Sequence, residues 1–270
     1  MSFSSPTQRL VLLLTGLALS GACADAPPAE EASDDTPAAL QVVEGSCGDV
    51  YGSSVCTWAK VDGDRIVEIG ANVPLAVAHN APPDQEMSWP PLVAALVAMP
   101  EIVQQQLGVH DLKIYWEAHG HPPGPYLVPH FDFHFYTAPA AEIEAIDCAS
   151  TTKPADVPAG YALPDIEIPE VGTLIGLCVP HMGMHALLET EMASSEAFTG
   201  TMVVGYYEGV PIHFEPMITK DLLLAEETFP LDMPTIPGLP AGVTVPTHFE
   251  AVYDESEAMY RFVFTGFPAM

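Results

Sequence analysis

The chain reads PHFDFHFY at residues 129–136, and this stretch decides the fold. Polar and aromatic residues alternate along it, which is typical of a β-strand whose successive side chains point to opposite faces. Phe131, Phe133 and Phe135 therefore share one face, which we expect to lie in the hydrophobic core. The opposite face carries the polar side chains, which are His130, Asp132, His134 and Tyr136. So many potential ligands in a row indicate a lined pocket rather than an ordinary solvent-exposed face.

Turn signals elsewhere in the chain extend the β interpretation. Strand-like runs flank Asp62-Gly63-Asp64, Glu208-Gly209 and residues 254–258. Three hairpins are therefore predicted, namely Val55–Val61 with Arg65–Val73, Thr201–Tyr207 with Val210–Met217, and His248–Tyr253 with Met259–Phe264. Leu92–Gln106 is predicted as a helix broken by Pro100, and Thr219 as the cap of a short helix. The predicted fold class is mainly β, an antiparallel sandwich or barrel with a few short helices, with α+β as the alternative.

The polar face of residues 129–136 cannot complete a metal site by itself. Residues i and i+2 of a strand lie about 6.6 Å apart and residues i and i+4 about 13 Å apart. Asp132 can therefore share an ion with either neighbouring histidine, whereas the two histidines reach one ion only by leaning together. Further ligands are available in HMGMH at residues 181–185 and in HFEPM at residues 213–217. The predicted ligand set is His130, Asp132, His134, His185 and Glu215, which suits zinc, iron, manganese or copper.

Neighbouring positions are predicted to support these ligands. They are His121, Tyr136, Met182, His213 and Met217. A methionine ligand such as Met182 would shift the preference toward copper. Two other interpretations remain open at this stage: a pocket for a small ligand, and a buried hydrogen-bond network of histidines and acids.

The sequence names no reaction. It contains no GxSxG, GxGxxG, P-loop or HExxH motif, which are typical of serine hydrolases, dinucleotide-binding proteins, nucleotide-binding proteins and zinc proteases. Two function classes therefore compete. One is a binding or structural protein of the cell envelope, and the other is a metal-dependent enzyme in which Glu215 or Asp132 acts as a base.

The N-terminus predicts export. Residues 1–22 are predicted as a signal peptide, because Arg9 precedes the apolar run LVLLLTGLAL and the small residues Ser20, Gly21 and Ala22. Cys23 follows directly and resembles a lipidation site, so we expect a lipoprotein of the periplasm or cell surface, or otherwise a secreted protein. Residues 23–40 are predicted as the lipidated cysteine and a disordered acidic Ala/Pro spacer. Residues 41–270 are then one globular domain, with membrane contact only through the anchor.

Cysteine count and charge set two further limits. An even number of cysteines in an exported domain predicts two disulfides, Cys47–Cys56 and Cys148–Cys178, since this pairing closes the shortest loops. The chain contains 36 acidic and 7 basic residues, for a net charge of −29. Phosphate binding needs lysine and arginine, so nucleic acid is excluded as a partner, while a metal ion or small ligand fits. The sequence does not set the oligomeric state.

Three longer strings resemble one family. GHPPGPYLVPHFDFHFY (residues 120–136), MGMH (182–185) and YYEGVPIHFEPMITKDLL (206–223) are similar to an uncharacterised bacterial family, first typed from a Thermus protein and classified as a domain of unknown function. Its members carry GHxPPxxYxxPHFDFHFY, MGxHW and a strand ending in EPMIT. Ala186 stands where the family usually has tryptophan. The resemblance implies that the recurring positions are His121, His130, Asp132, His134, Met182, His185, Glu215 and Met217, and it implies no reaction.

Overall fold

The computed structural model describes residues 40–168 and 172–268. The predicted signal peptide, the predicted lipidation site Cys23 and nearly all of the predicted acidic spacer lie outside these residues. The predicted globular domain begins within them, and the described residues belong to one compact unit.

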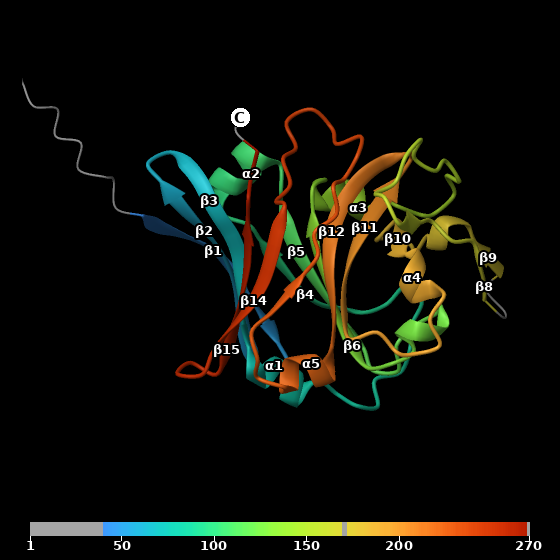
Figure 1. Cartoon of the computed structure of the whole chain (residues 1–270), viewed down its shortest axis with the longest axis horizontal. Helices are drawn as coiled ribbons and strands as arrows, with labels where there is room; N and C mark the ends of the chain where they lie inside the picture. The colour runs from blue at the N-terminus through green and yellow to red at the C-terminus, as the bar shows by residue number, and fades with distance from the viewer. Residues whose placement is uncertain (1–39, 169–171, 269–270) are drawn as a thin grey trace, which may run out of the picture. The chain divides into compact units, whose positions relative to one another are not determined.

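Two antiparallel sheets make up this unit, and Figure 1 shows them with β1–β3 in one sheet and β10–β12 in the other. The six-stranded sheet has the order β1 (Gln41–Val50), β2 (Ser53–Asp62), β3 (Arg65–Pro74), β15 (Met259–Thr265), β14 (His248–Asp254) and β13 (Phe229–Leu231). The seven-stranded sheet has the order β4 (Val93–Ala98), β5 (Asp111–Glu117), β6 (His130–Tyr136), β12 (Val210–Thr219), β11 (Gly200–Tyr207), β10 (Met184–Leu188) and β7 (Tyr161–Ala162). A small separate sheet pairs β8 (Ile166–Ile168) with β9 (Gly172–Leu174).

Aromatic side chains join the two large sheets. Phe133 of β6 packs edge-on against Phe262 of β15, with ring centroids 4.8 Å apart. Phe135 meets Phe264 at the same centroid distance of 4.8 Å. Among the described strands, each large sheet keeps two free edges, so the sheets stack rather than close on themselves. The predicted mainly β class is therefore confirmed as a sandwich, and the barrel and α+β alternatives are not supported.

The predicted hairpins are present. β2 and β3 turn at Gly63, which has a positive φ of 61° that glycine adopts without strain. β11 and β12 turn at Glu208-Gly209, and β14 pairs with β15. The strand predicted at residues 129–137 is β6, which lies between β5 and β12 in the middle of its sheet.

The helix prediction for Leu92–Gln106 was wrong in its first half. Val93–Ala98 forms strand β4, which pairs with β5, and only Glu101–Leu107 is helical, as α2. A short apolar run is compatible with a buried helix and with a strand. Here residues 93–98 form a strand because they pair with β5, whose other side pairs with β6. Pro100 separates the two elements, as the sequence predicts.

The other helices are short. They are α1 (Leu75–Asn80), α3 (Ala140–Glu144), α4 (Glu189–Met192) and α5 (Lys220–Leu224), with 3₁₀ turns at Gly124–Tyr126 and Ile175–Leu177. Thr219 caps α5 as predicted, because its hydroxyl accepts a hydrogen bond from the Leu222 amide at 3.3 Å. Within the described residues, no helix combines the length and apolar character needed to span a membrane.

Both predicted disulfides are present. Cys47 is bonded to Cys56 across the β1–β2 pair, and Cys148 is bonded to Cys178 over a separation of 30 residues. Two disulfides indicate an oxidising, extracytoplasmic compartment. The second bridge also ties down the segment that leads into β10, which carries His185.

Candidate metal centre

The polar face of β6 is as buried as its phenylalanine face. All seven residues of the strand are buried, including His130, Asp132 and His134 at 0%, 4% and 1% exposure. Burying a polar group costs free energy unless the group has a hydrogen-bond or ion-pair partner. The partners of these side chains therefore indicate the function of this face. The structure divides these side chains into two groups of candidate ligands.

The first group gathers side chains from three strands. One ligand atom from each of His134, His185, His213 and Glu215 lies within 4.8 Å of the others, and all four residues are buried. His134 belongs to β6, His213 and Glu215 to β12, and His185 to β10. Three imidazoles and a carboxylate are a ligand set for a divalent transition metal.

Strand register explains why these residues meet. Tyr136 pairs with His213, His213 with Gly205, and Gly205 with His185, so the four form one row across β6, β12, β11 and β10. Gly205 makes room for His213 in this row, because a Cβ there would lie 1.8 Å from Nε2 of His213. The imidazole of His213 thus occupies the space above a residue that has no side chain.

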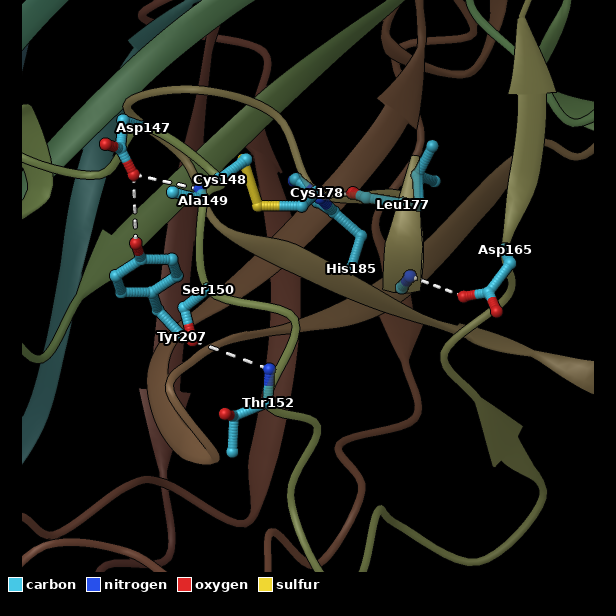
Figure 2. Close-up of a disulfide and its surroundings, with 11 residues drawn as sticks. Asp147, Cys148, Ala149, Ser150, Thr152, Asp165, Leu177, Cys178, His185 and Tyr207 are labelled. Atoms are coloured by element: carbon cyan, nitrogen blue, oxygen red, sulfur yellow. Dashed lines mark hydrogen bonds between the residues drawn. A yellow bond between two sulfur atoms is a disulfide. The ribbon is translucent and has the colours of Figure 1, made fainter. Parts of the chain in front are cut away.

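Hydrogen bonds orient two of the imidazoles. Nδ1 of His185 donates to the Leu177 carbonyl at 3.0 Å, which leaves Nε2 free to bind a metal. Nδ1 of His134 is 2.9 Å from the Tyr136 hydroxyl. Figure 2 shows the Cys148–Cys178 disulfide beside Leu177 and His185, so the bridge holds the backbone that orients this imidazole.

Other polar atoms of the first group lack hydrogen-bond partners among the described residues. They are Nε2 of His134, both ring nitrogens of His213 and Oε2 of Glu215. Nε2 of His134 lies 3.2 Å from Oε1 of Glu215, which is close but too poorly aligned for a hydrogen bond. A buried atom of this kind costs about 1–3 kcal/mol, so four of them together require an explanation.

Burial keeps this group uncharged. It lowers the pKa of His134 to about 3, lowers that of His185, and holds that of His213 well below its usual value. Burial, together with the nearby charge of Asp132, raises the pKa of Glu215 well above its usual value. The metal-free site thus offers neutral imidazoles with available lone pairs, and binding a cation would displace the proton of Glu215.

The second group consists of His121, His130 and Asp132, whose ligand atoms also lie within 4.8 Å of one another. Burial alone would raise the pKa of Asp132 and lower that of His130. Their mutual attraction outweighs burial, so the pKa of Asp132 falls to about 2 and that of His130 rises. Burial, together with the charge of His130, lowers the pKa of His121 to about 4.

One cavity of about 350 Å³ contacts both groups. His185 and Glu215 of the first group line it, as do His121 and Asp132 of the second. The remaining lining is mostly apolar and includes Met182, Met217, Leu177, Leu187, Met87 and Trp89. A larger cavity of about 510 Å³ near Thr137 and Pro211 contains neither group in its lining, so it does not bear on this chemistry.

The structure brings together only part of the predicted ligand set. His134, His185 and Glu215 converge, but His130 and Asp132 lie in the other group. His213, predicted as a supporting residue, is within the first group, and His121 is within the second. Tyr136 contacts His134 as a supporting residue, while Met182 and Met217 line the cavity.

Two further residues were not found from the sequence. Glu117 lies opposite His130 on β5 and lines the cavity, and Gly205 makes room for His213. A carboxylate directly after the strand-like run at residues 112–116 was the available signal for Glu117. Gly205 gave no signal, because a lone glycine in a strand has many explanations.

Comparison with known proteins adds no relative: the chain matches no family model, no curated protein and no solved structure. The class of protein therefore rests on the fold and the site alone. It is a β-sandwich with a buried group of histidines and a glutamate that could bind a metal.

Proposed function

We propose that this chain is an exported metal-binding protein that holds one divalent transition ion between His134, His185, His213 and Glu215. The observation that supports this most strongly is the convergence of four buried ligand atoms within 4.8 Å of one another. Two ligand atoms bound to one ion at about 2.1 Å lie at most about 4.2 Å apart. Small side-chain rotations are therefore enough to close the widest pair.

A hydrogen-bond network explains the group less well. A stable buried network satisfies each of its members, whereas His213 has a partner at neither ring nitrogen among the described residues. Its ring instead stacks on that of His134, with centroids 4.4 Å apart and planes at 10°. One cation accepts lone pairs from several of these atoms at once, which removes their desolvation cost.

The ligand chemistry narrows the metal. Nitrogen and carboxylate ligands without thiolates suit zinc, iron or manganese, and imidazole also binds copper. Met182 and Met217 line the same cavity as His185 and Glu215. Copper therefore stays among the candidate metals, together with zinc, iron and manganese.

Metal analysis of full-length protein, purified without added metal or chelator, tests this proposal. His213→Ala and His185→Ala should each bind one ion fewer per chain than the wild type, measured by plasma mass spectrometry. His119→Ala is the matched control, because His119 is exposed in a turn close to the site and should change nothing. Unchanged metal content in both site variants, with circular dichroism showing that they are folded, would contradict the proposal.

A metal-dependent enzyme is the second candidate. Two of the four ligands, His185 and Glu215, line the cavity, so a small molecule there reaches the ion directly. An open coordination position is the mark of a catalytic metal site, and Asp132 is a carboxylate on the same cavity that can act as a base. Cobalt-substituted protein should change its visible spectrum when azide is added. An unchanged spectrum would favour a closed, structural site.

Export and anchoring complete the proposal. The charged, apolar and small-residue order of residues 1–22, followed by Cys23, supports a lipoprotein, and the two disulfides fit an oxidising compartment. Membership of the family that shares PHFDFHFY remains part of the proposal. Cell fractionation tests the anchor: the wild type should sediment with membranes and Cys23→Ala should be soluble. A fully soluble wild type would indicate simple secretion instead.

A further inference from the structure

The second group lies outside the proposed metal centre and shares no ligand with it. We infer that His121, His130 and Asp132 form a second cation site on the same cavity, which takes a divalent transition ion. No residue belongs to both sites. The second site takes its ligands from β6 and from the loop before the Gly124–Tyr126 turn, whereas the first takes only His134 from β6. Neither β10 nor β12 contributes to it.

Backbone contacts orient both imidazoles of the second site. Nδ1 of His130 donates to the Val128 carbonyl at 2.6 Å, and Nδ1 of His121 donates to the Pro122 carbonyl at 2.9 Å. In each ring the other nitrogen, Nε2, remains available as a ligand. A carbonyl on the far nitrogen is the arrangement that fixes the orientation of metal-binding histidines.

Unpartnered atoms point to a ligand at this site. Nε2 of His130 and Oδ1 of Asp132 have no hydrogen-bond partner among the described residues. They lie 3.3 Å apart, so they attract each other as an ion pair in the metal-free protein, and the same separation is normal for two ligands of one ion. The rings of His121 and His130 meet edge to face, with centroids 4.9 Å apart.

The charges around the site also favour a cation. Glu117 lies opposite His130 in the β5–β6 pair and is only 8% exposed. Glu117 and Asp132 line the same cavity, so two carboxylates lie on one side of the proposed ion. A divalent ion between the histidines and Asp132 would offset the repulsion between them.

The two sites are separate positions on one cavity. His130 and His134 are four residues apart on β6, a distance of about 13 Å along a strand, so one ion cannot take both without distortion. His121 and Asp132 line the cavity at one site, and His185 and Glu215 line it at the other. A small molecule bound in the cavity can therefore contact both ions.

Zinc titration of the full-length chain after chelator treatment tests this inference. The wild type should bind two zinc ions, measured by equilibrium dialysis. Asp132→Asn and His121→Ala should each bind one, His213→Ala should bind one, and Asp132→Asn combined with His213→Ala should bind none. His119→Ala is the control and should bind two.

The outcomes separate this inference from the proposed function. If Asp132→Asn and His121→Ala bind as much zinc as the wild type, the second site is wrong whatever His213→Ala does. If the wild type binds one ion that Asp132→Asn loses and His213→Ala keeps, the second site stands and the first fails. Should Asp132→Asn fail to fold, His121→Ala decides, because His121 is only partly buried and lies in a loop.

Discussion

The two faces of β6 are equally buried but chemically opposite. Phe131, Phe133 and Phe135 are each 0% exposed and pack toward the six-stranded sheet, where every apolar atom gains contacts. On the other face, His130 and Asp132 are buried with unpartnered atoms. The phenylalanine face stabilises the fold through its packing. The polar face lowers the free energy of unfolding until a ligand binds its unpartnered atoms.

This difference indicates where function lies. A protein selected only for stability would place aliphatic residues on both faces, because buried polar groups without partners lower the free energy of unfolding. The polar face therefore indicates that these residues serve ligand binding rather than folding. The cavity beside it gives a ligand access to them. Substitutions on the two faces should separate into those that change stability and those that change metal binding.

The largest effect is expected on the phenylalanine face. Phe133→Ala removes a fully buried ring that packs against Phe262, and should lower the free energy of unfolding by about 3–5 kcal/mol. Urea denaturation measures this change. The folded fraction should keep its full metal content, and loss of metal from folded Phe133→Ala would show that the two faces do not act separately.

The second-largest effect is expected from removing the Cys148–Cys178 disulfide, which lies near His185. Replacing Cys148 and Cys178 by alanine should cost about 2–4 kcal/mol and should also weaken metal binding, because Leu177 holds His185 in place. Replacing Cys47 and Cys56 is the matched control: it opens a shorter loop of separation 9 and should leave metal affinity unchanged. Equal losses of affinity in both double variants would contradict the role given to the Cys148–Cys178 bridge.

Gly205→Ala should have an intermediate effect confined to the polar face. The added Cβ would lie 1.8 Å from Nε2 of His213, so the ring must move, at a cost of about 1–3 kcal/mol and with loss of one ion. In a His213→Ala background the same change should be nearly neutral. A double-mutant cycle measured by thermal denaturation checks this coupling, and additive effects would show that the close approach is not important.

The smallest effect concerns pH. Burial lowers the pKa of His134 to about 3, so in metal-free protein its contribution to stability is fully present above its unfolded value of 6.5 and is lost as pH falls toward 3. Glu215, whose pKa is raised, acts in the opposite direction, so the wild type alone does not isolate His134. The stability difference between the wild type and His134→Gln should change between pH 7 and pH 5, to the disadvantage of the wild type at pH 5. A pH-independent difference would contradict the neutral, buried state of His134.

The sequence by itself determined the local features. Alternation assigned every residue of β6 to a face, glycine-containing turns placed two of the three hairpins, and an even cysteine count gave the two disulfides. Each of these depends on interactions between residues that are near in sequence or on chain closure. They could therefore be read from spacing and residue type alone.

Only the tertiary structure decided how the polar residues are grouped. The sequence does not fix that β11 separates β10 from β12, or that Gly205 stands between His185 and His213. Strand order and register are set by packing of the whole sandwich, and they placed His213 inside the first group and moved His130 and Asp132 to the second. The same packing made Val93–Ala98 a strand. The deciding interaction is its pairing with β5, which the secondary-structure preference of residues 93–98 alone cannot predict.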